Sequence, residues 1–268
     1  MIRLMAFDLD GTLLGPEALL EPVVREAISD ARVAGITVTL ATGRMYCSAR
    51  QFAAELGLGS VPLIVFNGAL IQDNINERVY RHHVIDHATA CLVGRYLADA
   101  GVHVNIYRGD ALYVNEYDPI TEQYERRIGV TATVSPGVLA DLPWAPTKLL
   151  AVAAPAEVKR LAAGIRALVA DRVAIASSHP TFLEITGRSV NKGAALAEVA
   201  TMLGIDRAEV LAAGDGLNDL EMIRYAGIGV AAHGSYPEVL AEADCHAGPG
   251  PAGIAAVIRQ ATAGRLMP

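Results

Sequence analysis

The feature that most constrains the fold is an alternation of buried strands and helices at both ends of the chain. Near the N-terminus, short apolar runs at residues 2–7, 36–41 and 63–66 predict strands. Residues 20–31 and 45–56 read as helices, and a glycine ends each of them. Because strands joined by helices run parallel through right-handed crossovers, this pattern predicts a doubly wound α/β fold with a mostly parallel, Rossmann-like sheet.

The same alternation returns near the C-terminus. A helix is predicted over residues 192–203, with Asn191 as its N-cap, followed by strands at 210–213 and 228–231 and by further helices. Both ends of the chain are therefore expected to build one core domain.

The middle of the chain follows a different pattern. Strands at residues 103–107 and 112–116 are separated by Gly109-Asp110, a turn signal, and a second strand pair is expected at 173–177 and 182–186. Helices are expected beside them at about 87–100 and 155–170. We therefore predict an α/β core domain formed by residues 1–83 and 188–268, with an α+β domain, residues 84–187, inserted into it.

Composition narrows the function classes. The 268 residues carry 22 Lys+Arg and 29 Asp+Glu, a net charge of −7, and no basic run that would indicate nucleic-acid binding. No apolar run reaches the ~18 residues of a membrane span, and the apolar start is too short for a signal peptide. Three scattered cysteines (Cys47, Cys91 and Cys245) fit neither a disulfide framework nor a zinc site. These features favour a cytoplasmic protein, expected to be a monomer or a small homo-oligomer.

Four polar segments end a predicted strand or begin a predicted helix. They are residues 8–12 (Asp-Leu-Asp-Gly-Thr), 42–44 (Thr-Gly-Arg), 191–193 (Asn-Lys-Gly) and 214–219 (Gly-Asp-Gly-Leu-Asn-Asp). In a doubly wound sheet, ligands bind beyond the carboxyl ends of the strands. We therefore expect these segments to meet at one edge of the sheet.

Such a meeting would place like charges together. Two carboxylates ~4 Å apart repel by ~4 kcal/mol at an effective dielectric constant of 20. Asp8, Asp10 and Asp215 would therefore need a cation between them, and an all-oxygen donor set favours Mg²⁺.

The positive side of the site is expected to be a lysine. The chain has only three lysines, and Lys192 begins a predicted helix, where the helix dipole disfavours a cation. A nearby anion would explain this placement. Lys192, Thr42 and the metal ion together describe a pocket for a phosphoryl group.

In this order the four segments resemble the motifs of the haloacid dehalogenase superfamily. The Ala-Thr-Gly-Arg form at residues 41–44, Asn-Gly-Ala at 67–69 and a large insert after the third strand resemble its Cof-type sugar-phosphate phosphatase branch. The resemblance implies an Mg²⁺-dependent phosphatase of small phosphorylated metabolites, with sugar phosphates as the expected substrates. The inserted domain would be the cap that closes over the site and excludes water.

The resemblance also assigns roles to individual residues. Asp8 would attack phosphorus and form an aspartyl-phosphate. Asp10 would protonate the leaving group and then deprotonate the attacking water. Mg²⁺ would be held by the Asp8 side chain, the Asp10 backbone carbonyl and the Asp215 side chain. Thr42 and Lys192 would grip the phosphoryl oxygens.

The remaining candidates have supporting roles. Asn218 and Asp219 would steady the metal shell or Lys192. Gly43, Arg44, Asn67 and the loop at residues 178–180 are candidate contacts of the leaving group.

Two segments depart from the family pattern, and two other functions stay open. His-Gly-Ser at residues 233–235 replaces the usual Gly-Asn-Ala, and Gly-Pro-Gly-Pro at 248–251 replaces an Asn-rich segment. A phosphomutase would use the same chemistry but return the phosphoryl group to the substrate. A signalling module that stores phosphate on an aspartate is a third reading, although receiver domains are about half this length.

Overall fold

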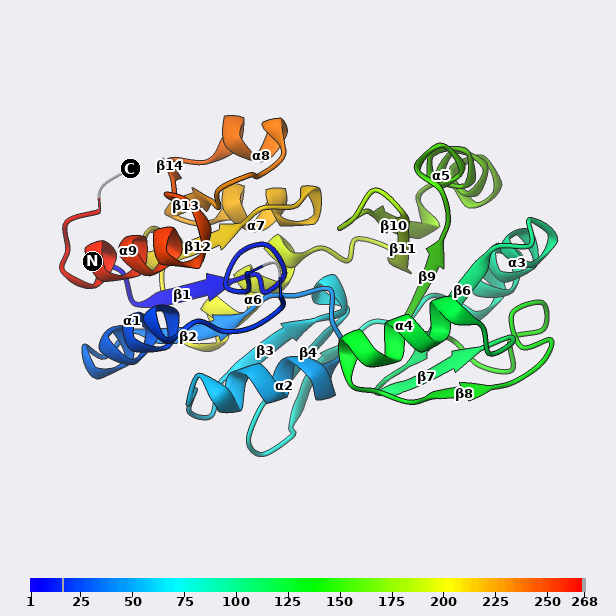
Figure 1. The fold of residues 1–268 in the computed structure, drawn as a ribbon, viewed down its shortest axis with the longest axis horizontal. Coiled ribbons are helices and arrows are strands. Elements are labelled where there is room, and N and C mark those ends of the chain that lie inside the picture. The colour runs from blue at the N-terminus through cyan, green and yellow to red at the C-terminus, as the bar shows by residue number, and fades with distance from the viewer. Residues whose placement is uncertain (16, 267–268) are drawn as a thin grey trace.

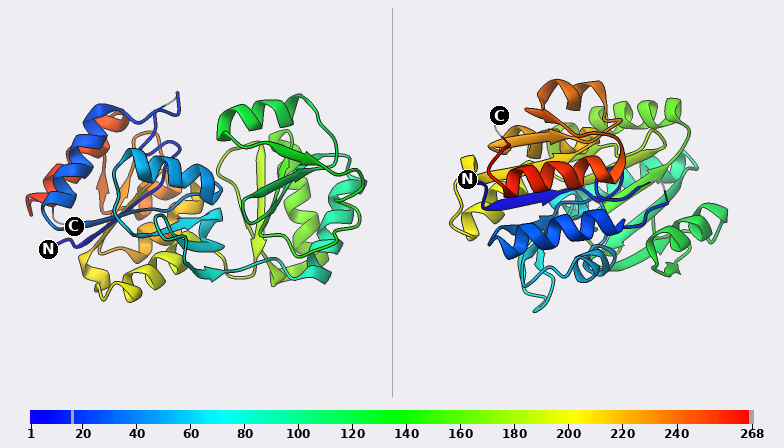
Figure 2. Two further views of the ribbon diagram at one scale, coloured as in Figure 1. Left: turned by 90° about the horizontal axis from the view of Figure 1, so that it is seen from below. Right: turned by 60° about the vertical axis from the view of Figure 1, so that its left-hand side comes forward.

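The computed structural model describes residues 1–15 and 17–266, and these form two lobes between which the chain passes twice (Figures 1 and 2). One lobe holds a five-stranded parallel sheet in the order β14-β13-β12-β1-β2. Its strands are β1 (Leu4–Phe7), β2 (Thr37–Leu40), β12 (Val210–Gly214), β13 (Ile228–Ala231) and β14 (Cys245–His246). The predicted mostly parallel α/β core is confirmed.

Helices cover both faces of this sheet. Successive side chains of a strand point to opposite faces, and β1 shows this directly. Met5 and Phe7 pack in the cluster that contains helices α1 (Pro22–Val33) and α9 (Gly250–Thr262), whereas Leu4 and Ala6 pack in the cluster of α6 (Lys192–Met202) and α7 (Leu220–Tyr225). Helices α2 (Tyr46–Glu55) and α8 (Pro237–Glu242) complete the lobe.

A small hairpin leads toward the second lobe. Strand β3 (Pro62–Val65) lies beside the parallel sheet with a parallel bridge between Ala41 and Ile64, and it pairs antiparallel with β4 (Leu70–Asp73). β4 pairs in turn with β5 (Val79–His82). Sequence patterns predicted β3 but missed β4 and β5.

The second lobe contains a six-stranded sheet in the order β10-β11-β9-β6-β7-β8. Its strands are β6 (His103–Arg108), β7 (Ala111–Val114), β8 (Ala132–Val134), β9 (Lys148–Val152), β10 (Val173–Ala176) and β11 (Phe182–Gly187). All neighbours pair antiparallel except β7 and β8, which are parallel. Helices α3 (His87–Asp99) and α5 (Pro155–Val169) pack in its main core, and α4 (Pro119–Ile128) lies beside the first lobe in Figure 1.

The two predicted antiparallel strand pairs are therefore confirmed as β6–β7 and β10–β11. Helix α4 and strands β8 and β9 were not predicted. The domain division after residues 83 and 187 stays a prediction. Within residues 1–15 and 17–266, the structure has no helix with the length and apolarity needed to cross a bilayer.

Candidate functional site

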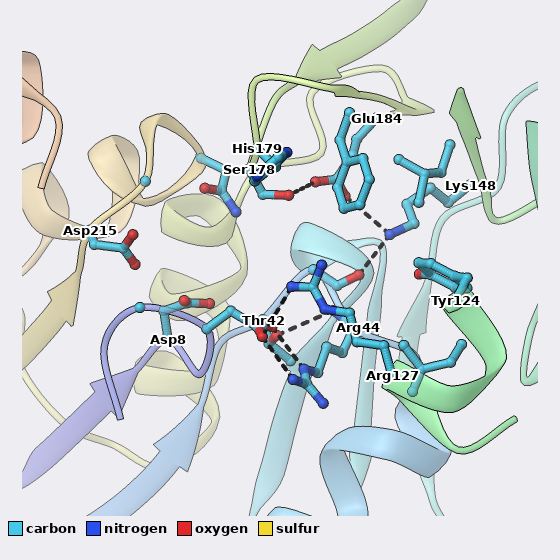
Figure 3. Close-up of a pocket in the computed structure, with 18 residues that line it drawn as sticks. Asp8, Thr42, Arg44, Tyr124, Arg127, Lys148, Ser178, His179, Glu184 and Asp215 are labelled. Carbon is cyan, nitrogen blue, oxygen red and sulfur yellow. Dashed lines mark hydrogen bonds and ion pairs between the residues drawn. The ribbon is translucent and has the colours of Figure 1, made fainter. Parts of the chain in front are cut away.

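The predicted site lies where the central strands of the parallel sheet end. In the register of that sheet, Phe7 lies beside both Ala213 and Leu40, so the residues after these three strands are neighbours. Asp8 follows β1, Thr42 follows β2 and Asp215 follows β12. A cavity of about 250 Å³ opens at this edge between the two lobes, with Asp8 and Asp215 on one side and Tyr124, Arg127 and Lys148 on the other (Figure 3).

Three carboxylates gather at the core side of the site. Asp8, Asp215 and Asp219 each offer an oxygen, and these oxygens lie within 4.8 Å of one another. Burial raises the pKa of Asp8 well above its ordinary value, although Lys192 opposes the shift. Burial and the charge of Asp219 raise the pKa of Asp215 to about 6. The cluster thus holds more negative charge than its neighbours neutralise.

Lys192 is the cation of this cluster. Its side chain is fully buried, and Nζ donates to Oδ1 of Asp8 and to Oδ1 of Asp219, both at 2.6 Å. Burial alone would lower the pKa of the ammonium group, but Asp219 and Asp8 raise it above its ordinary value. The Asn191 side chain accepts from the Ala194 backbone N–H at 2.7 Å, as predicted for the N-cap of α6, so the helix begins where Lys192 reaches the cluster.

The loop after β12 is held by Asp219. Oδ2 of Asp219 accepts from the backbone N–H groups of Asp215 and Gly216, at 3.0 and 2.9 Å. Asp215 also accepts from the Thr12 hydroxyl at 3.1 Å. Gly11 lies against it with a φ of +84°, and a Cβ atom there would lie 2.5 Å from Asp215 Oδ2. Only glycine combines this backbone conformation with such a close approach.

The Asp10 carboxylate accepts hydrogen bonds from two arginines, Arg44 and Arg127. Arg44 binds it with two hydrogen bonds, Nε to Oδ2 at 2.8 Å and Nη2 to Oδ1 at 2.7 Å. Arg127 of α4 reaches Oδ1 from the other lobe at 3.3 Å. Burial would raise the pKa of Asp10, but the bonds from Arg44 and Arg127 lower it below the ordinary value. Asp10 thus lines the cavity, and its two arginine partners favour the ionised form of its carboxyl group.

The remaining predicted residues also border the site. The Thr42 hydroxyl accepts from the Arg44 backbone N–H at 3.2 Å, and Gly43 lines the cavity. The Asn218 amide donates to Asn67 Oδ1 at 3.1 Å. Asn67, the second residue after β3, has a positive φ of 57°.

Some cavity residues were missed by the sequence analysis. Tyr124 and Arg127 lie on the unpredicted helix α4, Lys148 begins the unpredicted strand β9, and Glu184 lies within β11. Two features of the sequence could have indicated Lys148 and Glu184. Lys148 is one of only three lysines, and Glu184 is the single charged residue in the strand Phe182–Gly187.

The candidate leaving-group loop at residues 178–180 lies apart from the two segments that depart from the family pattern, residues 233–235 and 248–251. Ser178 and His179 line the cavity, but Pro180 borders a different groove. His233, Gly250 and Pro251 line a neighbouring groove that shares Asp10 with the site. Ser235 is buried, and its hydroxyl donates to the Ala232 carbonyl at 2.7 Å.

The donor set fits a hard divalent cation. The clustered side chains offer carboxylate oxygens, which Mg²⁺ prefers, and neither histidine nor cysteine belongs to the group. Burial and the neighbouring carboxylates raise the pKa values of Asp8 and Asp215, and a bound cation would oppose both shifts by stabilising the ionised carboxylates.

The structure thus combines a parallel α/β core, an acidic cluster beyond the ends of its strands and a second lobe that faces this cluster across the cavity. The model of haloacid dehalogenase-like hydrolases matches residues 5–258, and the chain belongs to that family. The resemblance predicted from the four motifs is therefore confirmed.

Individual relatives agree with this assignment. An HMP-PP phosphatase of Serratia proteamaculans is 31% identical over 241 residues, which cover 89% of this chain and 86% of that protein. The 5-amino-6-(5-phospho-D-ribitylamino)uracil phosphatase YcsE of Bacillus subtilis is 32% identical over 240 residues, covering 86% and 83%. The solved structure of a haloacid dehalogenase-like hydrolase from Bacillus subtilis superposes with a TM-score of 0.84 at 26% identity, covering 96% of this chain and 99% of the other.

Proposed function

We propose that this protein is an Mg²⁺-dependent phosphatase of small phosphorylated metabolites, with sugar phosphates as the expected class. The observation that carries the proposal is the cluster of Asp8, Lys192, Asp215 and Asp219 at the cavity. It combines a nucleophile, an ammonium group for phosphoryl oxygens and carboxylates for a divalent cation. In this proposal residues 84–187 form the cap over a core of residues 1–83 and 188–268.

In the first step, a carboxylate oxygen of Asp8 bonds to phosphorus while the bond to the leaving alkoxide breaks. The product is an aspartyl-phosphate on Asp8. Lys192 and the Thr42 hydroxyl donate to the phosphoryl oxygens, where negative charge is concentrated. Asp219 holds Lys192 in place for this task, which its 2.6 Å contact supports.

Asp10 moves the protons. As the acid it protonates the departing alkoxide, and as the base it then takes a proton from the water that cleaves the aspartyl-phosphate. The arginine contacts that keep Asp10 ionised support the second task. For the first task, a proton must reach Asp10 before the leaving group departs.

The cation would be held by the side chains of Asp8 and Asp215 and by the backbone carbonyl of Asp10, with Asn218 in support. When bound, Mg²⁺ supplies positive charge that offsets the repulsion between the phosphate and these carboxylates. Gly43 and Arg44 line the cavity, and Asn67 is hydrogen-bonded to Asn218, which also lines it; these positions support their proposed contacts with the leaving group.

A phosphomutase on sugar phosphates would use the same residues, so product analysis separates the two functions. Release of inorganic phosphate favours the phosphatase. A signalling module would keep its aspartyl-phosphate for minutes, and the second lobe and the Asp10 side chain beside the cavity favour turnover instead.

The decisive test is Asp8→Asn, assayed for phosphate release from a panel of phosphorylated metabolites and from p-nitrophenyl phosphate. Asparagine keeps the shape but not the nucleophile, so we expect turnover to fall at least ~10³-fold. Asp30→Asn, an exposed position on α1, is the matched control and should behave as the wild type. Unchanged turnover in Asp8→Asn would refute the nucleophile assignment.

A further inference from the structure

A buried ion pair of the second lobe faces the cavity without a role in the chemistry above. Lys148 Nζ lies 3.0 Å from Glu184 Oε2, and both side chains are only 3% exposed. The Ser178 hydroxyl donates to the other oxygen of Glu184 at 2.5 Å. A buried ion pair is weak evidence for stability, because desolvation offsets the attraction between the charges. Stability alone therefore does not explain the ion pair of Lys148 and Glu184.

Both partners reach across to the core lobe. Lys148 Nζ donates to the backbone carbonyl of Gly43 at 2.7 Å. Glu184 Oε2 accepts from the Asn67 amide at 2.8 Å, and Asn67 in turn accepts from Asn218. The pair thus connects three strand-end segments of the core, those after β2, β3 and β12, and Figure 3 shows Lys148 aimed at the segment after β2.

The surroundings of Gly43 and of the Lys148 ammonium group are tightly packed. A Cβ atom on Gly43 would lie 3.0 Å from Asn67 Oδ1 and 3.3 Å from Glu184 Oε2. Two aromatic rings flank the ammonium group of Lys148, with centroids 4.9 Å away for Tyr107 and 5.7 Å away for Phe66. A charged donor to a carbonyl gives a stronger hydrogen bond than a neutral one. Lys148 therefore fixes the backbone between Thr42 and Arg44.

We propose that Lys148 is a positioning residue, which Glu184 holds in place and which fixes the loop that carries Thr42 and Arg44. This inference rests on the proposed function, because that function gives Thr42 its phosphoryl oxygen and Arg44 its hold on Asp10. The seating of the second lobe on the core thereby sets the geometry of the phosphoryl pocket. A misplacement of about 1 Å in such a loop can lower the rate ~10²-fold.

Four variants separate positioning from stability. Lys148→Met and Glu184→Gln each leave a buried charge without its partner, so both should lower the melting temperature by roughly 10 °C. The double variant leaves neither charge and should recover most of that loss. Its turnover should nevertheless stay about 10²-fold below the wild type, because the Gly43 carbonyl still lacks its donor. Lys159→Met changes an exposed lysine of the same lobe in the same way and should alter neither quantity.

Hydrogen–deuterium exchange of the peptide spanning residues 42–47 measures how readily the backbone of this loop opens, and it requires no substrate. Exchange should rise in Lys148→Met and in the double variant, and should stay at the wild-type level in Lys159→Met. A stable double variant with wild-type exchange and turnover would overturn the inference. If the loop is loosened but the wild type shows no Asp8-dependent phosphate release, the proposed function fails and the positioning role of Lys148 stands.

Discussion

At the scale of single residues, the site is defined by an imbalance of charge. Lys192 is ion-paired with the buried Asp8 and Asp219, while burial and the charge of Asp219 raise the pKa of the half-buried Asp215 to about 6. A buried carboxylate with a raised pKa is typical of functional sites, where it is compensated by a ligand. The cluster therefore costs stability whenever the cation is absent.

The first residue-scale prediction concerns Asp215 in protein treated with a chelator. Its folded pKa of about 6 lies above the ordinary value of 3.8, so between these values the folded state binds more protons than the unfolded state. The contribution of this carboxyl to stability therefore falls as pH rises through that window. Asp215→Asn should melt above the wild type at pH 7.5, and the difference should shrink toward pH 4.5.

Added Mg²⁺ supplies the control for this prediction. At 100 times its Kd, a cation that binds only the folded state adds ~2.7 kcal/mol. The melting temperature of the wild type at pH 7.5 should therefore rise by roughly 5–10 °C, and that of Asp215→Asn should not. A rise with zinc alone would contradict the argument from oxygen ligands, and equal rises in both proteins would remove Asp215 from the cation site.

At the scale of elements, the site depends on where strands end and helices begin. The polar segments after β1, β2 and β12 could be predicted to meet for two reasons. Buried parallel strands are recognisable in a sequence as apolar runs, and the carboxyl ends of such strands lie at one edge of the sheet. The start of α6 could be predicted as well, because Asn191 is a strong N-cap residue. Local signals thus sufficed for the core side of the site.

The element-scale prediction concerns that cap. Asn191→Ala removes the acceptor for the Ala194 backbone N–H and should lower the free energy of unfolding by about 1 kcal/mol. Because α6 carries Lys192 at its first turn, turnover should fall as well, by a few-fold. Asn191→Asp keeps an acceptor and should retain stability. Urea denaturation measures the difference, and equal midpoints for the alanine and aspartate variants would refute the capping role.

At the scale of the whole molecule, the cavity exists only because two lobes meet. On the side of the second lobe, the lining residues come from helix α4, from strands β9 and β11 and from the loop before β11, and no local pattern specifies the sheet order that makes β9 and β11 neighbours. Lys148 and Glu184 become neighbours through the register of β9 and β11, in which Lys148 lies beside Thr186 and Glu184 beside Leu150. This is why the core side of the site could be predicted from sequence, whereas on the side of the second lobe only the loop with Ser178 and His179 could be.

The size of the cavity is the basis of the last prediction, which concerns substrate size. A cavity of about 250 Å³ lies at the small end for ligand pockets, and Arg127 of the second lobe contacts Asp10 across it. Phosphoryl groups on hexoses, pentitols or single aromatic rings should reach Asp8, whereas a phosphoserine within a folded protein should not. Phosphate release measured in parallel from hexose 6-phosphates and from a phosphorylated protein should therefore differ by at least about 10²-fold in kcat/KM. Comparable rates on both would mean that the second lobe swings clear of the site, and that leaving-group size is not selected by this contact between the lobes.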